Sequence, residues 1–310
     1  MAPRNRNSFR ISGGSDSSYT RAQFRREFPD DATCLEWLKD RTYPDGIHCS
    51  LCDKVTPHYR VLSRPSYSCQ FCGHHVHPMR GTIFEKSSTN LVLWFEAIFI
   101  ISSTRCGISA KQLEREIGVT YKTAWRMFHL IRSMLGESDG TKLSGKVEVD
   151  ETYFTRSLRT RPKTARGRTG YSPGKQVVMG MVERKGQVVA KHIPAASSIE
   201  LNSHIREFIL PGSLVFTDHL PAYRNLRKKG YQHHRINHSQ KVYVKGDTHT
   251  NTIESFWGLL KNNLQGVYHS VSAKYLQLYI DEVAFRYNRR SKGYPMFRDV
   301  LGRASARPVA

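Results

Sequence analysis

The spacing of apolar residues differs between two long parts of the chain. Between about residues 86 and 136 it follows a helical repeat, and the apolar run Leu91–Ile101 is interpreted as the core helix of this part. From Lys146 to Asp150 apolar and polar residues alternate instead, which is typical of a strand with one buried face. The pattern predicts a helical segment that is followed, from about residue 145 to 290, by mixed strands and helices.

The mixed region contains several further predicted elements. Strands are expected at 176–182, 187–193, 214–216 and 232–236, and the turn 183–186 joins the first two as a hairpin. Helices are expected at 198–209, 221–228 and 252–264, and the last of these has an apolar stripe. The resulting order is three strands, a helix, a strand, a helix, a strand and a helix. This is the order of the ribonuclease H fold.

Within the helical segment, residues 108–117 and 120–135 predict two helices that are joined by a turn at Gly118. Thr120 is a suitable N-cap for the second helix. Such a pair is similar to a helix-turn-helix, whose second helix reads base edges in the major groove. The residues expected to reach the bases are Tyr121, Lys122, Thr123 and Arg126. The alternative is an ordinary helical bundle, in which the same pattern is common.

Four of the six cysteines form two C-x-x-C pairs. Two thiolates from each pair can bind one Zn²⁺ tetrahedrally, so the spacing predicts a zinc ribbon. The expected ligands are Cys49, Cys52, Cys69 and Cys72. Zinc would be structural here, because four cysteines leave no open position for a substrate. The alternatives are redox pairs, or substitution of a ligand by one of the histidines at 74, 75 and 77.

The net charge narrows the choice of partner. The chain has 48 Lys and Arg against 26 Asp and Glu, which gives +22 at pH 7. Such a surplus attracts polyanions, of which nucleic acid is the commonest. An anionic membrane is the alternative, but no basic amphipathic helix, lipidation signal or signal peptide is recognised. We therefore expect double-stranded DNA and no membrane as partner, and a location with the nucleoid in the cytoplasm, or in the nucleus of a eukaryotic host.

Local composition completes the expected organisation, a multidomain α+β protein. Residues 155–175 hold seven Lys and Arg and no acid, which predicts a loop that contacts DNA or is merely solvated. The basic residues expected at DNA are Arg159, Arg161, Lys163, Arg166 and Arg168. The expected parts are a disordered basic arm (1–20), a zinc ribbon domain (21–85), a helical DNA-binding domain (86–136), a ribonuclease H-like α/β catalytic domain (145–290) and a C-terminal tail (291–310).

Three acidic residues have informative places in this strand order. Asp150 is on the first strand, Asp218 ends the fourth and Glu254 is on the last helix, so neighbouring central strands would bring the two aspartates together. Three carboxylates suit Mg²⁺ or Mn²⁺, and two such ions activate water and stabilise the leaving oxygen in phosphodiester cleavage. Taken singly, Asp218 could be only an N-cap. Glu151 should point to the face opposite Asp150, and we interpret it as structural.

Three blocks of sequence carry a resemblance to a known family: Val149–Phe154, Phe216–Asp218 and Asn251–Lys261. They resemble the blocks of DDE transposases of bacterial insertion sequences, and more narrowly the zinc-ribbon group that is related to Merlin transposons. Thirty-five residues separate Asp218 from Glu254, the spacing familiar in D-D-35-E enzymes.

The resemblance covers roughly residues 30–290 and implies roles for particular side chains. It implies that the three acidic residues are metal ligands, and that Lys261, on the same helix face as Glu254, contacts DNA. In some members of this group Asn takes the third position, and Asn251 lies one turn before Glu254. We prefer Glu254 because a carboxylate binds Mg²⁺ more strongly than an amide, which leaves Asn251 and His249 as expected supports of the ligands.

The predicted function is that of a DNA transposase. It would bind terminal inverted repeats through its ribbon and helical domains, hydrolyse the element ends and transfer the freed 3′-OH to target DNA. Pairing of two ends implies at least a homodimer on DNA. Two alternatives stay open: a transposase-derived DNA-binding regulator without catalysis, and a ribonuclease H-like nuclease that cuts but does not join.

Overall fold

The computed structural model describes residues 19–104, 106–136, 142–155, 175–236, 249–290 and 296–306. The chain divides into two units, one of Met1–Ser103 with Ser291–Ala310 and the other of Thr104–Arg290. Among the described residues, no helix combines the length and apolar character that a membrane span requires. The predicted arm at 1–20 lies outside the described residues up to position 18.

The first unit has an aromatic core between four helices. These are α1 (Arg21–Glu27), α2 (Asp31–Thr42), α3 (Leu91–Ser103) and α9 (Met296–Ser305). Phe297 of α9 packs between Phe24, Phe28 and Phe99, with ring centroids 5.7 to 6.1 Å apart. The segment expected as a C-terminal tail therefore contributes a core helix, because burial of Phe297 offsets the cost of ordering it.

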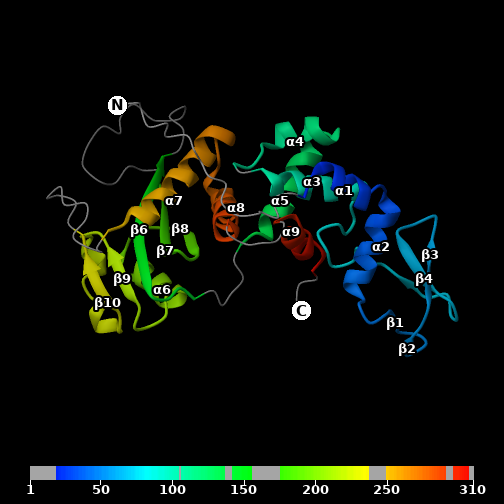
Figure 1. Ribbon diagram of the computed structural model, residues 1–310, viewed down its shortest axis with the longest axis horizontal. Helices are drawn as coiled ribbons and strands as arrows, with labels where there is room; N and C mark the ends of the chain where they lie inside the picture. Colours follow the sequence, from blue (N-terminus) through cyan, green and yellow to red (C-terminus); the bar gives the residue numbers. More distant parts are fainter. Residues whose placement is uncertain are drawn as a thin grey trace, which may run out of the picture. The chain divides into compact units, whose positions relative to one another are not determined.

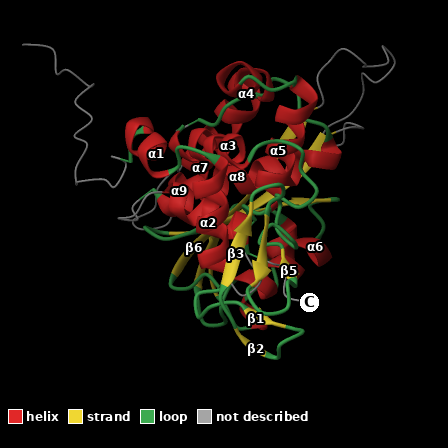
Figure 2. Cartoon of the chain, turned by 90° about the vertical axis from the view of Figure 1, so that its right-hand side faces the viewer, coloured by secondary structure: helices red, strands yellow, loops and turns green. Residues whose placement is uncertain are grey.

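Short strands and loops make up the cysteine-containing part of this unit (Figure 2). One sheet pairs β1 (His48–Cys49) with β2 (Lys54–Val55), and a second has the order β3 (His58–Val61), β4 (Ser66–Cys69), β5 (His75–Val76). Gly73 follows the second cysteine pair with a φ of +72°, a conformation that glycine adopts at little cost. Strand β3 lies between the two cysteine pairs, and β4 ends at the first cysteine of the second pair.

The second unit begins with the two predicted helices, α4 (Ala110–Ile117) and α5 (Tyr121–Ser133). Gly118 between them is left-handed, and the Thr120 side chain accepts the N–H of Thr123, so both the turn and the cap are confirmed. The expected domain 86–136 is divided differently, because α3 belongs to the first unit and this helix pair to the second.

A buried ion-pair network holds α5 against α8 (Leu276–Arg289). Arg132 of α5 donates from Nε to Glu282 at 2.6 Å, and Arg286 and the Tyr268 hydroxyl contact the same carboxylate at 2.7 and 2.8 Å. Burial opposes ionisation of Glu282, but the charges of Arg132 and Arg286 outweigh it and lower its pKa to about 2. The predicted recognition helix is thus joined to the rest of its unit by charge as well as by packing.

The centre of the second unit is a five-stranded sheet with helices on both faces (Figure 1). Its strands are β6 (Lys146–Thr155), β7 (Lys175–Glu183), β8 (Val188–Ile193), β9 (Leu214–Thr217) and β10 (Gln232–Arg235), in the spatial order β10-β9-β6-β7-β8. Only β7 runs antiparallel to the others. One face packs against α6 (Ser198–Phe208), and the other against α7 (Asn251–Asn262) and α8.

The predicted order of strands and helices is found as far as α7, with two local differences, and α8 follows as a helix that the sequence pattern did not predict. The helix expected at 221–228 is two short 3₁₀ turns, Pro221–Tyr223 and Arg227–Lys229. The last predicted helix, α7, begins at Asn251 rather than 252, and it continues beyond Asn262 as a π-helical turn, Asn263–Val267.

Candidate functional site

The candidate site lies where β9 stops covering the edge of β6. The two strands pair in parallel only as far as Glu148 opposite Phe216, and Asp218 follows directly after β9. The next residues of β6 are therefore not paired on that side by β9. Carboxylate oxygens of Asp150, Glu151 and Asp218 lie within 4.8 Å of one another there. The structure thus brings together the two predicted aspartates.

Glu151 is the first departure from the sequence interpretation, which treated it as structural. Strand alternation does direct it away from the face of Asp150. However, at the part of the β6 edge that β9 does not pair, its side chain reaches the same carboxylate cluster. Its Oε1 atom is buried and has no hydrogen-bond partner among the residues that the structure describes. Glu151 is thus a member of the candidate site.

The acidic cluster is electrostatically unfavourable as it stands. Burial raises the pKa of Asp150, and the charges of Asp218 and Glu254 add to this, while a hydrogen bond from Trp257 to Asp150 opposes it. Burial and the charges of Asp150 and Asp218 raise the pKa of Glu151 to about 9. A divalent cation would remove this repulsion, and carboxylate oxygens are the ligands that Mg²⁺ and Mn²⁺ prefer. The residues therefore fit a divalent metal.

Glu254 lies apart from this cluster. It is exposed in the first turn of α7, and its Oε1 accepts a hydrogen bond from the Thr250 hydroxyl at 3.1 Å. Among the described residues, the carboxylate cluster with oxygens within 4.8 Å of one another does not include Glu254. The charge of Glu254 nevertheless helps to raise the pKa of Asp150. Asn251 is also exposed at the start of α7. The choice between Glu254 and Asn251 as third ligand stays a prediction.

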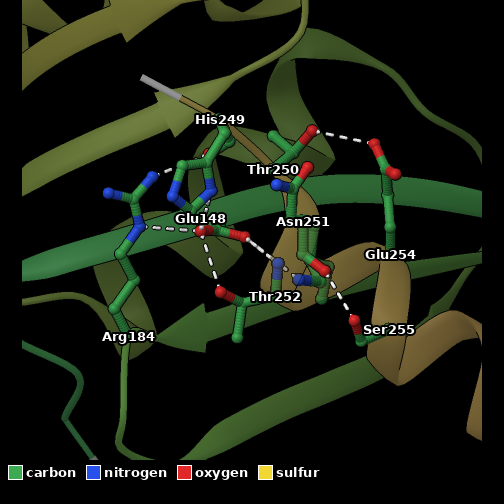
Figure 3. A network of polar contacts seen from close by, with 9 residues as sticks. Glu148, Arg184, His249, Thr250, Asn251, Thr252, Glu254 and Ser255 are labelled. Carbon is green, nitrogen blue, oxygen red and sulfur yellow. Dashed lines mark hydrogen bonds and ion pairs between the residues drawn. The ribbon is translucent and has the colours of Figure 1, made fainter. Parts of the chain in front are cut away.

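A buried polar network connects the start of α7 with β6 (Figure 3). Glu148 has no exposed surface, and it accepts hydrogen bonds from the backbone N–H groups of Thr252 and Ile253. Arg184 pairs with it at 2.7 Å. The Nδ1 of His249 lies 3.3 Å from Glu148, without hydrogen-bond geometry. Sequence reasoning missed Glu148, although its place two residues before Asp150 puts both on one strand face.

Close packing of α7 on the sheet also depends on Gly180. This residue lies opposite Asp150 in the β6–β7 ladder. A Cβ atom there would come within 2.5 Å of the Trp257 ring and 2.8 Å of Ile253. The missing side chain lets Trp257 approach the sheet, where its Nε1 donates to Asp150 at 2.9 Å. In the sequence Trp257 belongs to the apolar stripe and to the block Asn251–Lys261, and neither pattern predicts its hydrogen bond to Asp150.

The four predicted zinc ligands converge. Their sulfur atoms all lie within 4.8 Å of one another, with 3.4 Å between Cys49 and Cys72 and 3.9 Å between Cys52 and Cys69. A hydrogen bond with the Thr56 hydroxyl is the main cause that lowers the pKa of Cys69 to about 5. Metals bind the thiolate form of cysteine. A cluster of four cysteines at this spacing fits tetrahedral Zn²⁺.

The predicted DNA contacts are partly described. Tyr121, Lys122 and Arg126 are exposed on α5, and Thr123 is half-buried. Lys261 is exposed on α7, two turns after Glu254. The five predicted basic residues of the loop lie outside the described residues, which stop at 155 and resume at 175.

Sequence comparisons relate this chain to proteins of transposable elements. The family model of the ISXO2-like transposase domain matches residues 142–288. The uncharacterized protein in transposable element ISH50 of Halobacterium salinarum is 30% identical over 254 residues, which are 76% of this chain and 84% of that protein. An uncharacterized transposase-like protein of Haemophilus influenzae is 32% identical over 104 residues, 34% of this chain and 83% of its own length.

Solved structures give a weaker similarity. The crystal structure of the Mos1 strand transfer complex has a TM-score of 0.28 and 11% identity, over 68% of this chain and 74% of that chain. The Mos1 paired-end complex with the left transposon end has a TM-score of 0.27 and 10% identity, over 68% and 75%. Similarity at this level carries no argument about fold or activity.

Proposed function

Because the chain belongs to the DDE transposases of insertion sequences, we propose that it cuts and joins DNA strands at the ends of its element. The observation that carries this proposal is the meeting of Asp150, Glu151 and Asp218 at the edge of β6 beyond its pairing with β9. Three ionised carboxylates this close repel one another, and a bound divalent cation would offset that repulsion.

We infer that Asp150 and Asp218 hold the catalytic metal, with Glu254 or Asn251 from α7 and the newly found Glu151 as further ligands. Two Mg²⁺ or Mn²⁺ ions would supply an activated water and charge stabilisation for the leaving oxygen. The protein's own contribution is to hold these carboxylates on β6, on the end of β9 and on α7. Hydrolysis would free a 3′-OH, which then attacks a phosphodiester of the target DNA.

The architecture of the second unit supports a ribonuclease H-like catalytic domain. Its sheet has the first strand at the centre, and only the second strand runs against the others. Asp150 on the central strand and Asp218, directly after its neighbour, then lie close together. This arrangement favours the fold that the order of elements predicted.

DNA binding is proposed for the exposed start of α5, with Tyr121, Lys122 and Arg126, and for Lys261 on α7. Thr123 and the basic loop are proposed as additional contacts. The four-cysteine cluster would bind one structural Zn²⁺ and hold its short strands together, since segments this small rarely fold without a metal or disulfides. Pairing of two element ends requires at least two copies of the chain on DNA.

The test is a strand-transfer assay on DNA that carries the element's ends, with Mg²⁺ or Mn²⁺. Asp150→Ala and Asp218→Ala should abolish cleavage and joining while DNA binding is retained. Glu254→Ala, Asn251→Ala and Glu151→Ala in parallel identify the further ligands. Cleavage without joining would assign a nuclease instead, and tight binding without cleavage a DNA-binding regulator. Full activity of either aspartate variant would refute the metal site.

A further inference from the structure

Helix α7 begins without a local side-chain cap. Thr250, at its N-cap position, makes no capping hydrogen bond within the described residues, whereas α4, α5 and α6 are each capped by a Ser or Thr of their own. The first N–H groups of a helix need partners from outside the helix. In α7 those of Thr252 and Ile253 donate to Oε2 of Glu148, at 2.8 and 3.0 Å. The cap is therefore supplied by β6.

The carboxylate of Glu148 is fully committed to these contacts. Its Oε1 accepts from Nε of Arg184 at 2.7 Å and from the Thr252 hydroxyl at 3.0 Å. Arg184 also donates to the carbonyl of His249 at 2.8 Å, and its guanidinium lies 4.2 Å from the Phe216 ring centroid. Figure 3 shows Glu148 between Arg184 and the first turn of α7. The pair thus joins β6, β9 and the segment that leads into α7.

The place of this network relates it to the acidic site. Glu148 precedes Asp150 by two residues on the same face of β6. Phe216 of β9 precedes Asp218, which directly follows that strand, by two residues. Helix α7 carries both candidates for the third ligand. A negative charge at a helix N-terminus is also favoured by the helix dipole. Through these hydrogen bonds Glu148 therefore fixes the distance between the first turn of α7 and the strand that carries Asp150.

We propose that Glu148 is a positioning residue, which holds the first turn of α7 in register with Asp150. Because its own oxygens are occupied by Arg184 and α7, it acts through the helix and not on DNA. The inference rests on the proposed function, but it applies whether Asn251 or Glu254 completes the metal site. A ligand displaced by about 1 Å can cost roughly 100-fold in rate.

The test uses the full-length protein and Glu148→Gln, which keeps the size of the side chain but removes its charge and one acceptor. Amide hydrogen exchange is measured at Thr252 and Ile253, together with DNA affinity and single-turnover cleavage at saturating DNA. We expect faster exchange at both amides and cleavage reduced roughly 100-fold. DNA affinity should change by no more than about twofold, because the lost interaction is not with bound DNA.

Glu282→Gln is the matched control for loss of stability. Glu282 is similarly buried and paired with arginine in the same unit. Its described partners lie on α5, on α8 and at Tyr268, and none is near the first turn of α7. This variant should keep the Thr252 and Ile253 amides protected and should cleave bound DNA normally. A second variant, Glu148→Met with Arg184→Met, leaves no uncompensated buried charge, so thermal stability should recover while cleavage stays low.

Three results would overturn the proposal. The first is unchanged exchange at Thr252 and Ile253 in Glu148→Gln. The second is an equal loss of cleavage in Glu282→Gln, and the third is recovery of cleavage together with stability in the double variant. If the wild-type protein cuts no DNA, the proposed function fails, and the exchange measurement still decides whether Glu148 holds α7.

Discussion

Gly180→Ala is a small change that should move α7 relative to the acidic cluster on the sheet. The added Cβ would lie 2.5 and 2.7 Å from two ring atoms of Trp257 and 2.8 Å from Ile253 Cδ1. Ordinary van der Waals contact begins at 3.4 Å. Since the ring is rigid and buried, we expect α7 to recede from the sheet by about 1 Å.

Two consequences follow from this displacement. Overpacking of this kind costs about 1–3 kcal/mol in the free energy of unfolding, which lowers Tm by roughly 2–10 °C. The hydrogen bond from Trp257 to Asp150, now 2.9 Å, would lengthen by a similar shift. Because the first turn of α7 moves with the helix, cleavage should fall roughly 100-fold.

The assay pairs thermal unfolding with single-turnover cleavage of DNA that carries the element's ends. Gly258→Ala, on the outer side of α7, is the matched control, since its Cβ would meet no described atom within 4 Å. That variant should raise the stability by about 0.5–1 kcal/mol, because alanine is the better helix former. Wild-type stability and cleavage in Gly180→Ala would refute the close packing on which this reasoning depends.

Three further outcomes are expected. The lowered pKa of Glu282 contributes stability that is full above about pH 4.5 and is lost as the pH falls towards 2, so urea unfolding should show wild type and Glu282→Gln converging in acid. At neutral pH this variant should be about 3–5 kcal/mol less stable, because Arg132 stays buried and unpaired. Removal of zinc by a chelator should abolish amide protection between residues 48 and 76, and Cys52→Ser should do the same without a chelator. In metal-free buffer Asp150→Asn should raise Tm by relieving the repulsion, and it should remove the rise in Tm that Mg²⁺ gives the wild type.

Local sequence patterns predicted the elements that depend on local chemistry. Alternation from Lys146 to Asp150 located β6, and the Thr120 hydroxyl predicted the start of α5 because a cap acts on N–H groups only three residues away. The cysteine spacing predicted the sulfur cluster for a similar reason, since each C-x-x-C turn brings its own two thiols together.

Features that depend on the extent of strand pairing were not predictable in this way. Strand alternation correctly places Glu151 and Asp150 on opposite faces of β6. It does not predict that β9 stops pairing with β6 at Glu148, which lets Glu151 reach the carboxylate cluster. Local rules do not predict the cap of α7 either. It joins Glu148 to Thr252 and Ile253, which lie 104 and 105 positions further along the chain. The sequence of α9 does carry a helical signal, since the buried residues Phe297, Val300 and Leu301 lie at helical spacing.

The most direct test of the metal site replaces each aspartate by cysteine and compares two ions. A thiolate binds Mg²⁺ poorly and Mn²⁺ better. If a cysteine variant is active in Mn²⁺ but not in Mg²⁺, the replaced residue is a metal ligand. We predict that Asp150→Cys and Asp218→Cys lose cleavage in Mg²⁺. In Mn²⁺ each variant should cleave at least about tenfold faster than it does in Mg²⁺. Equal loss in both ions, or full cleavage in Mg²⁺, would contradict a metal held by these two side chains.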